Sequence, residues 1–203
     1  MADFDKAFEL LGKGIEWNDC ENIFKINKRE SAPTFAGVYL KYYKHTLLYS
    51  YLKEVLKEEF NIDLDNPQNL EKLKQDKQLQ KKISQYLCKD STAINYVKQI
   101  YRKLFWSRIK GDKIANQKIT NVIFAQAVNL GVKKAVKILQ KCLDVKQDGI
   151  IGNITLTTLN NADISKLIEC LKEEYKKYYC EIVKSKPYLA INLAGWHNRV
   201  DRL

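Results

Sequence analysis

Apolar residues recur along most of the chain at the spacing of an amphipathic α-helix. After Leu47 they stand at positions i, i+3, i+4 and i+7, as Leu48, Tyr51, Leu52 and Val55. This spacing places the side chains on one face of a helix. Two further segments repeat it: Ile94, Val97, Tyr101 and Leu104, then Ile164, Leu167, Ile168, Leu171, Tyr175, Tyr178 and Ile182. No long segment alternates with period two, so the pattern predicts a mainly α protein, with a short hairpin possible around residues 17–33.

Local signals mark where the predicted helices begin and end. Asp163 stands where it can cap the last long helix, and Pro187 follows the end of that helix. Residues 61–82 are polar and contain the turn signal Asn66-Pro67. We interpret this stretch as an exposed helical excursion or an insert, without chemistry of its own.

A soft boundary lies near residue 112, after the aromatic segment that ends at Gly111. The helices beyond it are too apolar to stand alone. We therefore expect two lobes in one compact body, with residues 1–111 forming the first lobe and residues 112–203 the second.

The formal net charge of the 203-residue chain is +11. Basic residues alternate with acidic ones, as in Lys53-Glu54 and Lys172-Glu173, which is typical of a solvated surface. No apolar run reaches the roughly 18 residues of a membrane span, so membrane insertion is not expected. The first residues lack a secretory signal, which predicts synthesis in the cytoplasm without a signal peptide.

The five cysteines stand at positions 20, 88, 142, 170 and 180, without a CxxC spacing. Cys170 and Cys180 fall on one predicted helix, about 15 Å apart, too far for a mutual disulfide. The odd number and the spacing indicate free thiols in a reduced compartment.

Several chemistries lack the residues that they need. His45 and His197 are the only histidines, which leaves little material for a His-rich metal site or a Ser-His-Asp triad. Phosphate-binding, dinucleotide-binding and zinc-binding motifs are missing from the sequence. We therefore expect no metal or cofactor. A basic helical nucleic-acid binder is a distant alternative, because the charge permits it but no motif supports it.

The segment from Asp148 to Asn153 has the composition of a helix-to-helix connector. Asp148-Gly149 is a turn dipeptide. Ile150 and Ile151 are expected to anchor the loop in the core, Gly152 to let the chain reverse, and Asn153 to cap the next helix.

The last third of the chain contains this loop within a longer ordered set of residues. The set comprises Ala127-Val128-Asn129, Gly131, Ala135, Leu139-Gln140, Asp148 to Gly152, Thr155-Leu156, Gly195-Trp196 and Arg199-Val200. It resembles the peptidoglycan-binding half of the glycoside hydrolase family 108 proteins, which are N-acetylmuramidase-like endolysins and secretion activators. The resemblance implies a lysozyme-like helical fold and peptidoglycan binding by residues 112–203.

The resemblance also suggests substrate-binding residues in this half. They are Gln117, Asn129, Trp196 and Arg199. Trp196 and Arg199 are three apart, so on a helix they share a face and can either bind a sugar or pack the chain end. The family commonly has an Asp three positions before the Val-Asn pair, where this chain has Ala125. Asp112 is expected to cap the helix that leads into this half.

The family's N-terminal pattern is a helix followed by Glu-Gly-Gly, and later Thr-x-x-Gly. This chain has the helix, then Glu16-Trp17, with Thr34 and Gly37 at the later positions. The resemblance makes Glu16 the catalytic acid, Thr34 a catalytic residue, and Trp17 and Gly37 substrate-binding residues. The missing glycines depart from the family pattern.

Cleavage of a glycosidic bond requires protonation of the leaving oxygen, so the acid must stay protonated near neutral pH. An apolar setting such as Ile15 and Trp17 favours that state. A second carboxylate steadies the cation or activates water. Asp19 is our choice, and Glu21 and Glu30 are further candidates.

The sequence thus predicts a peptidoglycan hydrolase that cleaves the glycan strand by acid catalysis. The expected partner is peptidoglycan, with no nucleic acid and with secretion or phage lysis machinery as further partners. The place of action is the cell wall or periplasm after export. The alternative is a degenerate family member that binds peptidoglycan or a secretion or phage partner without cleaving.

Overall fold

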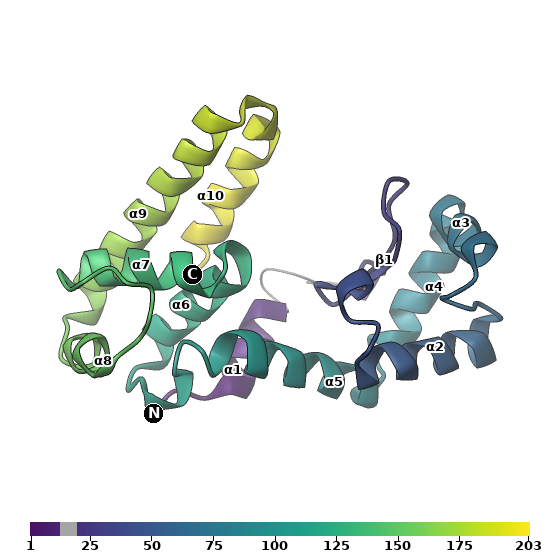
Figure 1. The fold of residues 1–203 in the computed structure, drawn as a ribbon, viewed down its shortest axis with the longest axis horizontal. Coiled ribbons are helices and arrows are strands. Elements are labelled where there is room, and N and C mark those ends of the chain that lie inside the picture. Colours follow the sequence, from purple (N-terminus) through teal and green to yellow (C-terminus); the bar gives the residue numbers. More distant parts are fainter. Residues whose placement is uncertain (13–19) are drawn as a thin grey trace. The chain divides into compact units, whose positions relative to one another are not determined.

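The computed structural model describes residues 1–12 and 20–203 (Figure 1). Its secondary structure is mainly helical, with one small three-stranded sheet, which confirms the predicted mainly α class. The chain forms two compact units. One comprises Met1–Leu11 and Arg102–Leu203, and the other comprises Gly12–Tyr101. The predicted division into functional lobes of residues 1–111 and 112–203 is distinct from these structural units and stays a prediction.

In the unit of residues 12–101, the described residues form the sheet and four α-helices. The strands are β1 (Phe24–Lys25), β2 (Thr34–Phe35) and β3 (Val38–Tyr39), followed by a 3₁₀ turn, η2 (Leu40–Tyr42). The helices are α2 (Leu47–Phe60), α3 (Pro67–Gln75), α4 (Lys77–Leu87) and α5 (Ser91–Tyr101). The polar stretch of residues 61–82 is therefore largely helical. Asn66 caps α3 by accepting from Gln68 N (2.9 Å), and Asp76 caps α4 by accepting from Leu79 N (2.8 Å).

The sheet is antiparallel in the order β1-β2-β3, with Phe24 opposite Phe35. Ala36 and Gly37 connect β2 to β3 with φ angles of 45° and 78°. Two consecutive positive φ angles match the right-handed twist of a two-residue hairpin. The short hairpin considered around residues 17–33 corresponds in part to the β1–β2 pair, and the tight two-residue turn follows it at Ala36-Gly37.

The outer edge of β1 is closed by side chains of α4. Ser84 Oγ accepts from Phe24 N (3.0 Å) and donates to Phe24 O (2.9 Å). Gln80 accepts from Ile26 N and donates to Ile26 O, both at 3.2 Å. Gln80 and Ser84 are four residues apart and buried, so they lie on one helix face and satisfy the backbone as a fourth strand would.

The buried face of α2 differs in part from the predicted stripe. Its buried residues are Leu48, Tyr49, Leu52 and Leu56. Tyr51 and Val55 lie at its margin, and the Tyr51 hydroxyl donates to Asp90 Oδ2 (2.8 Å). Tyr49 and Leu56 thus take the buried positions that the pattern gave to Tyr51 and Val55. The Tyr51 hydroxyl has its polar partner at the edge of the core.

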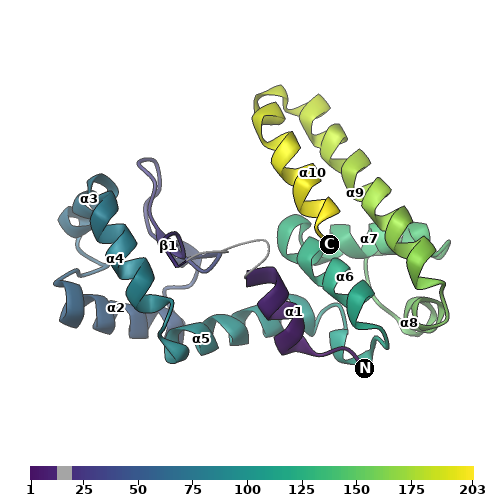
Figure 2. The ribbon, with the colours of Figure 1, turned by 180° about the vertical axis from the view of Figure 1, so that it is seen from behind.

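The other unit begins with α1 (Phe4–Leu11) and continues through the second half of the chain. A π-helical turn (Arg102–Trp106) and a 3₁₀ turn (Gly111–Lys113) precede the remaining helices. These are α6 (Gln117–Leu130), α7 (Val132–Cys142), α8 (Asn153–Asn160), α9 (Ile164–Ser185) and α10 (Leu193–Asp201), with the 3₁₀ segment η5 (Pro187–Asn192) before α10. Figures 1 and 2 show α9 and α10 side by side as an antiparallel hairpin.

Aromatic packing fixes α1 on α6. Phe4, Trp106 and Phe124 have ring centroids 5.5–6.0 Å apart in edge-to-face pairs. Trp106 is fully buried and donates from Nε1 to Asp112 Oδ1 (2.9 Å). The sequence predicted that Asp112 caps α6. Asp112 instead anchors the Trp106 indole, so that prediction is wrong. The cap is Asn116, whose side chain accepts from Ile119 N (3.2 Å).

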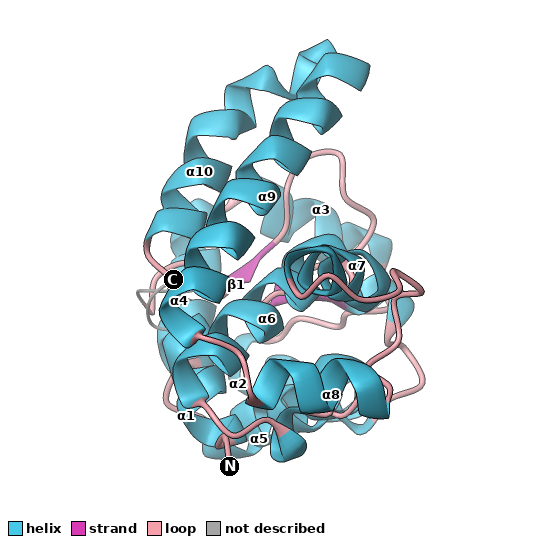
Figure 3. Ribbon diagram, turned by 90° about the vertical axis from the view of Figure 1, so that its left-hand side faces the viewer, coloured by secondary structure: helices cyan, strands magenta, loops and turns pink. Residues whose placement is uncertain are grey.

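The helices at the chain's end follow the predicted pattern closely. Asp163 accepts from Ser165 N (3.0 Å) and caps α9 as predicted. Pro187 follows the end of α9, as predicted. Within the described part of the chain, every helix is too short or too polar to cross a bilayer. Figure 3 shows how small a share the strands have beside the helices.

The prediction of five free thiols is wrong. Cys20 forms a disulfide with Cys88, and Cys142 with Cys170, with Cα atoms 5.4 and 5.9 Å apart. Cys180 is free. The pairs are 68 and 28 residues apart in sequence, so only the packing of separate segments brings them together. Each compact unit contains one of the two disulfides.

Candidate functional site

The loop between α7 and α8 is organised around the buried side chain of Gln140. Its Nε2 atom donates to Asp148 Oδ1 (2.8 Å), Ile150 O (3.0 Å) and Thr155 Oγ1 (3.2 Å). Its Oε1 atom accepts from Gly149 N (2.8 Å). One amide thus joins the end of α7, the loop and the first turn of α8, which explains why these residue types occur together in the motif.

The structure of this loop confirms the predicted turn at Gly149 and corrects the roles predicted for Ile150 and Asn153. Gly149 has φ 82°, as expected for the turn, and a Cβ there would lie 2.7 Å from Lys133 Cγ. Ile151 is buried, but Ile150 is 68% exposed, so only one of the two anchors the loop. Gly152 has an ordinary negative φ of −83° and is itself the N-cap, so α8 begins at Asn153.

The carboxylate of Asp148 is stabilised by this network. The Gln140 side-chain hydrogen bond, followed by the Ile150 backbone N–H (2.9 Å), holds the pKa of Asp148 below its ordinary value. A depressed folded-state pKa contributes stability that is present above the ordinary pKa and lost as pH falls through the folded value. The loop is therefore stable with Asp148 ionised at neutral pH.

Replacement of Gln140 by glutamate is expected to destabilise the unit that contains it by about 2–4 kcal/mol at neutral pH. The two amide donors would be lost and a second carboxylate would face Asp148. Urea unfolding measures the loss, which should shrink in mild acid because a protonated carboxyl group in place of the amide can again donate. Gln75→Glu, at an exposed site on α3, is the matched control and should change stability little. Equal stability of Gln140→Glu and wild type at neutral pH would contradict this role.

Three of the predicted substrate-binding residues lie where α6, α9 and α10 meet. The Arg199 guanidinium donates from Nη1 to Asn129 Oδ1. The Trp196 ring stacks on Tyr179, with centroids 5.0 Å apart, and the Tyr179 hydroxyl donates to Gln126 Oε1 (3.1 Å). The structure therefore brings Asn129, Trp196 and Arg199 together, and each of them has a packing or capping contact.

Two amide nitrogens of this cluster are buried without a hydrogen-bond partner among the described residues. They are Gln126 Nε2 and Asn129 Nδ2, which stand three residues apart on one face of α6. Buried donors normally find an acceptor. Sequence reasoning did not single out Gln126 or Tyr179, because a buried glutamine and a helix-face tyrosine carry no motif of their own. Ala125, where the family commonly has Asp, is buried beside them.

Gln117 lies at the opposite end of α6 from this cluster. Its Oε1 atom accepts from Asp3 N (2.6 Å), and its Nε2 atom donates to Asp3 O (3.0 Å) and Asn121 Oδ1 (2.7 Å). The amide thus ties the start of the chain to α6. Twelve residues of helix, about 18 Å, separate it from Asn129.

The predicted catalytic segment is described only in part. Glu16, Trp17 and Asp19 lie outside the described residues. Thr34 is half-buried in β2 opposite Tyr39, and Gly37 is exposed in the hairpin turn with φ 78°. The positive φ explains why glycine suits that position of the Thr-x-x-Gly pattern.

The further carboxylate candidates both have structural contacts. Glu21 forms an ion pair with Lys81, with Oε1 2.5 Å from Nζ. Glu30 Oε2 accepts from Asn27 N (2.7 Å) and closes a local turn. Each contact is exposed, so each carboxylate can still exchange its partner for solvent.

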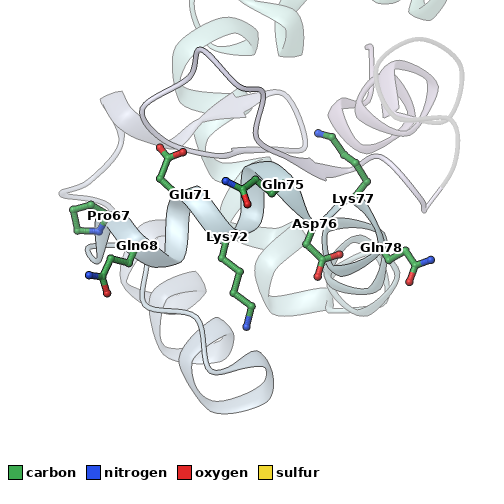
Figure 4. A pocket seen from close by; sticks show the side chains of 8 residues that line it. All are labelled: Pro67, Gln68, Glu71, Lys72, Gln75, Asp76, Lys77 and Gln78. Carbon is green, nitrogen blue, oxygen red and sulfur yellow. The ribbon is translucent and has the colours of Figure 1, made fainter.

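A hollow of about 820 Å³ lies over α3 and the start of α4. Figure 4 shows Glu71 and Lys72 on opposite sides of α3. Glu71 pairs with Lys74 (2.5 Å), and Asp76 caps α4. The charged groups here do not converge as a catalytic pair requires. Among residues 1–12 and 20–203, no three His, Cys, Asp or Glu side chains are grouped to hold a metal ion.

Comparisons with known proteins agree with the residue pattern. Residues 67–131 match the family model described as Glycosyl hydrolase 108, and residues 134–201 match the model described as Predicted Peptidoglycan domain. No curated protein matches the chain.

The fold also resembles a solved structure, that of SagA from Brucella abortus. The two chains superpose with a TM-score of 0.60 at 19% identity, over 98% of this chain and 91% of that one. This likeness concerns the fold, and it extends over both units. The two family models follow each other along the chain without overlap. Residues 67–131 are thus similar to the glycosyl hydrolase 108 family, and residues 134–201 are similar to a predicted peptidoglycan domain.

Proposed function

We propose that the protein is a peptidoglycan hydrolase of the N-acetylmuramidase type, which cleaves between N-acetylmuramic acid and N-acetylglucosamine. The observation that carries this proposal is the succession of a glycosyl hydrolase match at residues 67–131 and a peptidoglycan domain match at residues 134–201. A region that holds the polymer beside a region that cuts it raises the local concentration of scissile bonds. The functional regions would be residues 1–111 and 112–203.

In this proposal Glu16 is the general acid. It protonates the glycosidic oxygen as positive charge develops on the sugar. Asp19 is the second carboxylate, which steadies the cation or activates water. Thr34 acts beside them from β2, and Trp17 and Gly37 contact the glycan.

The second half of the chain supplies further contacts to the wall polymer. Trp196 and Arg199 offer an aromatic face and a guanidinium on one helix, and Asn129 holds that guanidinium through its amide oxygen. Such groups suit sugars and peptide carbonyls, which present apolar ring faces and acceptor oxygens. Gln117, whose amide holds Asp3, would contribute at the far end of α6.

The two disulfides bear on where the protein acts. Disulfides persist in oxidising compartments and are rare in the reduced cytosol. Cys20–Cys88 and Cys142–Cys170 therefore support action at the cell wall or in the periplasm. Secretion or phage lysis machinery would then provide the route out of the cytoplasm.

One observation favours a second candidate function, that of a wall-binding protein without hydrolase activity. The glycosyl hydrolase match begins at residue 67, so Glu16 lies outside it. The altered glycines after Glu16 and the alanine at position 125 point the same way. Such a protein would retain the contacts of residues 112–203 and lose the cleavage.

Digestion of purified peptidoglycan tests both candidates. Fragments released by the oxidised protein are reduced with borohydride and analysed by mass spectrometry. A muramidase leaves N-acetylmuramic acid at the new reducing end, so this sugar should appear as its alcohol. A new reducing end on N-acetylglucosamine would overturn the bond assignment. Release of nothing, with the protein still pelleting with the wall, would replace the hydrolase by the binder.

A further inference from the structure

The connection between α9 and α10 lies at the far end of their hairpin, away from the other helices of the unit. The segment η5 (Pro187–Asn192) joins the two helices and contains no buried residue. It packs mainly against α9 and α10 themselves. Figures 1, 2 and 3 all show this end projecting away from α6, α7 and α8. We call residues 184–192 the hairpin tip.

Large apolar side chains of the hairpin tip face solvent. Tyr188 is 75% exposed and Ile191 is 89% exposed. Among the described residues only Met1, at 92%, is a large apolar side chain more exposed than Ile191. Single exposed apolar residues are common on proteins. A tyrosine and an isoleucine together on a protruding connection, where polar residues would serve the turn equally well, indicate a surface that is covered in function.

The charge of the same region is one-sided. Residues 182–200 contain no Asp or Glu, although the whole chain has 24 of them in 203 residues. They contain Lys184, Lys186 and Arg199, and both lysines are exposed beside η5. At the base of the hairpin the lysines are neutralised instead. Lys176 pairs with Asp201 (2.5 Å) there, and other lysines pair with Glu174.

We propose that the hairpin tip docks on the surface of an anionic phospholipid bilayer. Lys184 and Lys186 would contact lipid phosphates, Tyr188 would lie at the headgroup level, and Ile191 would reach the acyl boundary. In this proposal the contact is peripheral, because only side chains of the hairpin tip enter the interface.

The kind of side chain at the tip favours lipid over glycan. A wall polymer is also anionic, but sugars are recognised by stacking on aromatic faces and by hydrogen bonds. Ile191 supplies neither, and an aliphatic side chain gains free energy only where apolar surface is removed from water. An acid-free basic turn with an exposed tyrosine and isoleucine has the chemistry of an interfacial anchor. The proposal does not depend on hydrolase activity.

Co-sedimentation with vesicles tests the proposal. The oxidised full-length protein is mixed with vesicles of phosphatidylcholine, with or without phosphatidylglycerol. Two tip variants are compared with wild type: Tyr188→Ser with Ile191→Ser, and Lys184→Gln with Lys186→Gln. The matched controls are Tyr42→Ser with Ile154→Ser, both 75% exposed, and Lys57→Gln with Lys89→Gln at other exposed sites.

Wild type should bind the anionic vesicles, and each tip variant should bind roughly tenfold or more weakly. The control variants should stay within about twofold of wild type, and salt should weaken binding. Tyr188→Trp should show a blue-shifted emission with anionic vesicles only. Equal losses in tip and control variants would overturn the proposal, since charged or apolar side chains anywhere on the surface would then explain binding. It would also be overturned if the tip variants lost retention on purified peptidoglycan while vesicle binding stayed unchanged.

Discussion

Replacement of Glu16 by glutamine is expected to slow the release of soluble fragments from purified peptidoglycan by about 10³-fold. A glutamine has nearly the same shape but cannot transfer a proton to the leaving oxygen, and general acid catalysis contributes roughly 10²–10⁴-fold. The assay is turbidity clearing, with fragment release measured as reducing sugar. Sedimentation with the wall should be unchanged, because binding does not require the proton.

The matched control is Glu54→Gln, an exposed carboxylate on α2. It should clear peptidoglycan at the wild-type rate. If Glu16→Gln retained most of the activity, the acid would be another residue, and Asp19, Glu21 and Glu30 would be the next variants. If wild type itself cleared nothing, the comparison would instead favour the binding protein.

Loss of both disulfides is expected to destabilise the protein by several kcal/mol. Bridges that close loops of 68 and 28 residues stabilise their units by about 4 and about 3.5 kcal/mol in the chain-entropy model, because they restrict the unfolded chain. For units of this size, each loss corresponds to a fall in Tm of roughly 15–20 °C. Thermal unfolding with and without a reductant measures the sum.

Paired serine variants separate the two bridges. Cys20→Ser with Cys88→Ser should lower the stability of the unit of residues 12–101, and Cys142→Ser with Cys170→Ser that of the other unit. Cys180→Ser is the control, because Cys180 is free. Addition of reductant to a protein with all four bridging cysteines replaced should change nothing. An unchanged Tm of the oxidised protein on reduction would contradict the stabilising role.

Helical periodicity predicted much of the fold. The apolar spacing of α9 is long and regular, and its buried residues Leu167, Ile168, Leu171 and Tyr175 belong to the predicted stripe, whereas farther along Tyr179 is buried in place of the predicted Tyr178. Asp163 and Pro187 marked its ends because capping and proline chemistry are local. The strands were located less well, since β1, β2 and β3 have two residues each and such lengths carry no measurable period.

Non-local contacts were beyond sequence reasoning. Gln80 and Ser84 look like ordinary polar positions on an amphipathic helix, and only the packing of β1 against α4 reveals their bonds to Phe24 and Ile26. The disulfides were missed for the same reason. The cysteine count and spacing are properties of the chain, whereas the pairing of Cys20 with Cys88 is a property of the packed unit.

The residues that organise the α7–α8 loop could be named from the sequence, because they lie close together in one motif. Gln140, Asp148, Gly149 and Thr155 were named from the pattern, and they form one hydrogen-bonded network. The contact between Asn129 and Arg199 joins residues 70 positions apart. The resemblance named both residues, but spacing alone does not pair them. The roles of Glu16, Asp19 and Thr34 rest on the family pattern and stay predictions.

The first helix belongs to the unit formed by the second half of the chain. The unit of residues 12–101 is therefore a cassette that enters after Leu11 and leaves before Arg102. Cleavage at a single position cannot release either unit whole. Cleavage before Arg102 would leave α1 on the fragment of residues 1–101 and remove Phe4 from its contacts with Trp106 and Phe124. Exchange of the cassette between relatives at these two joints is the engineering route that preserves both cores.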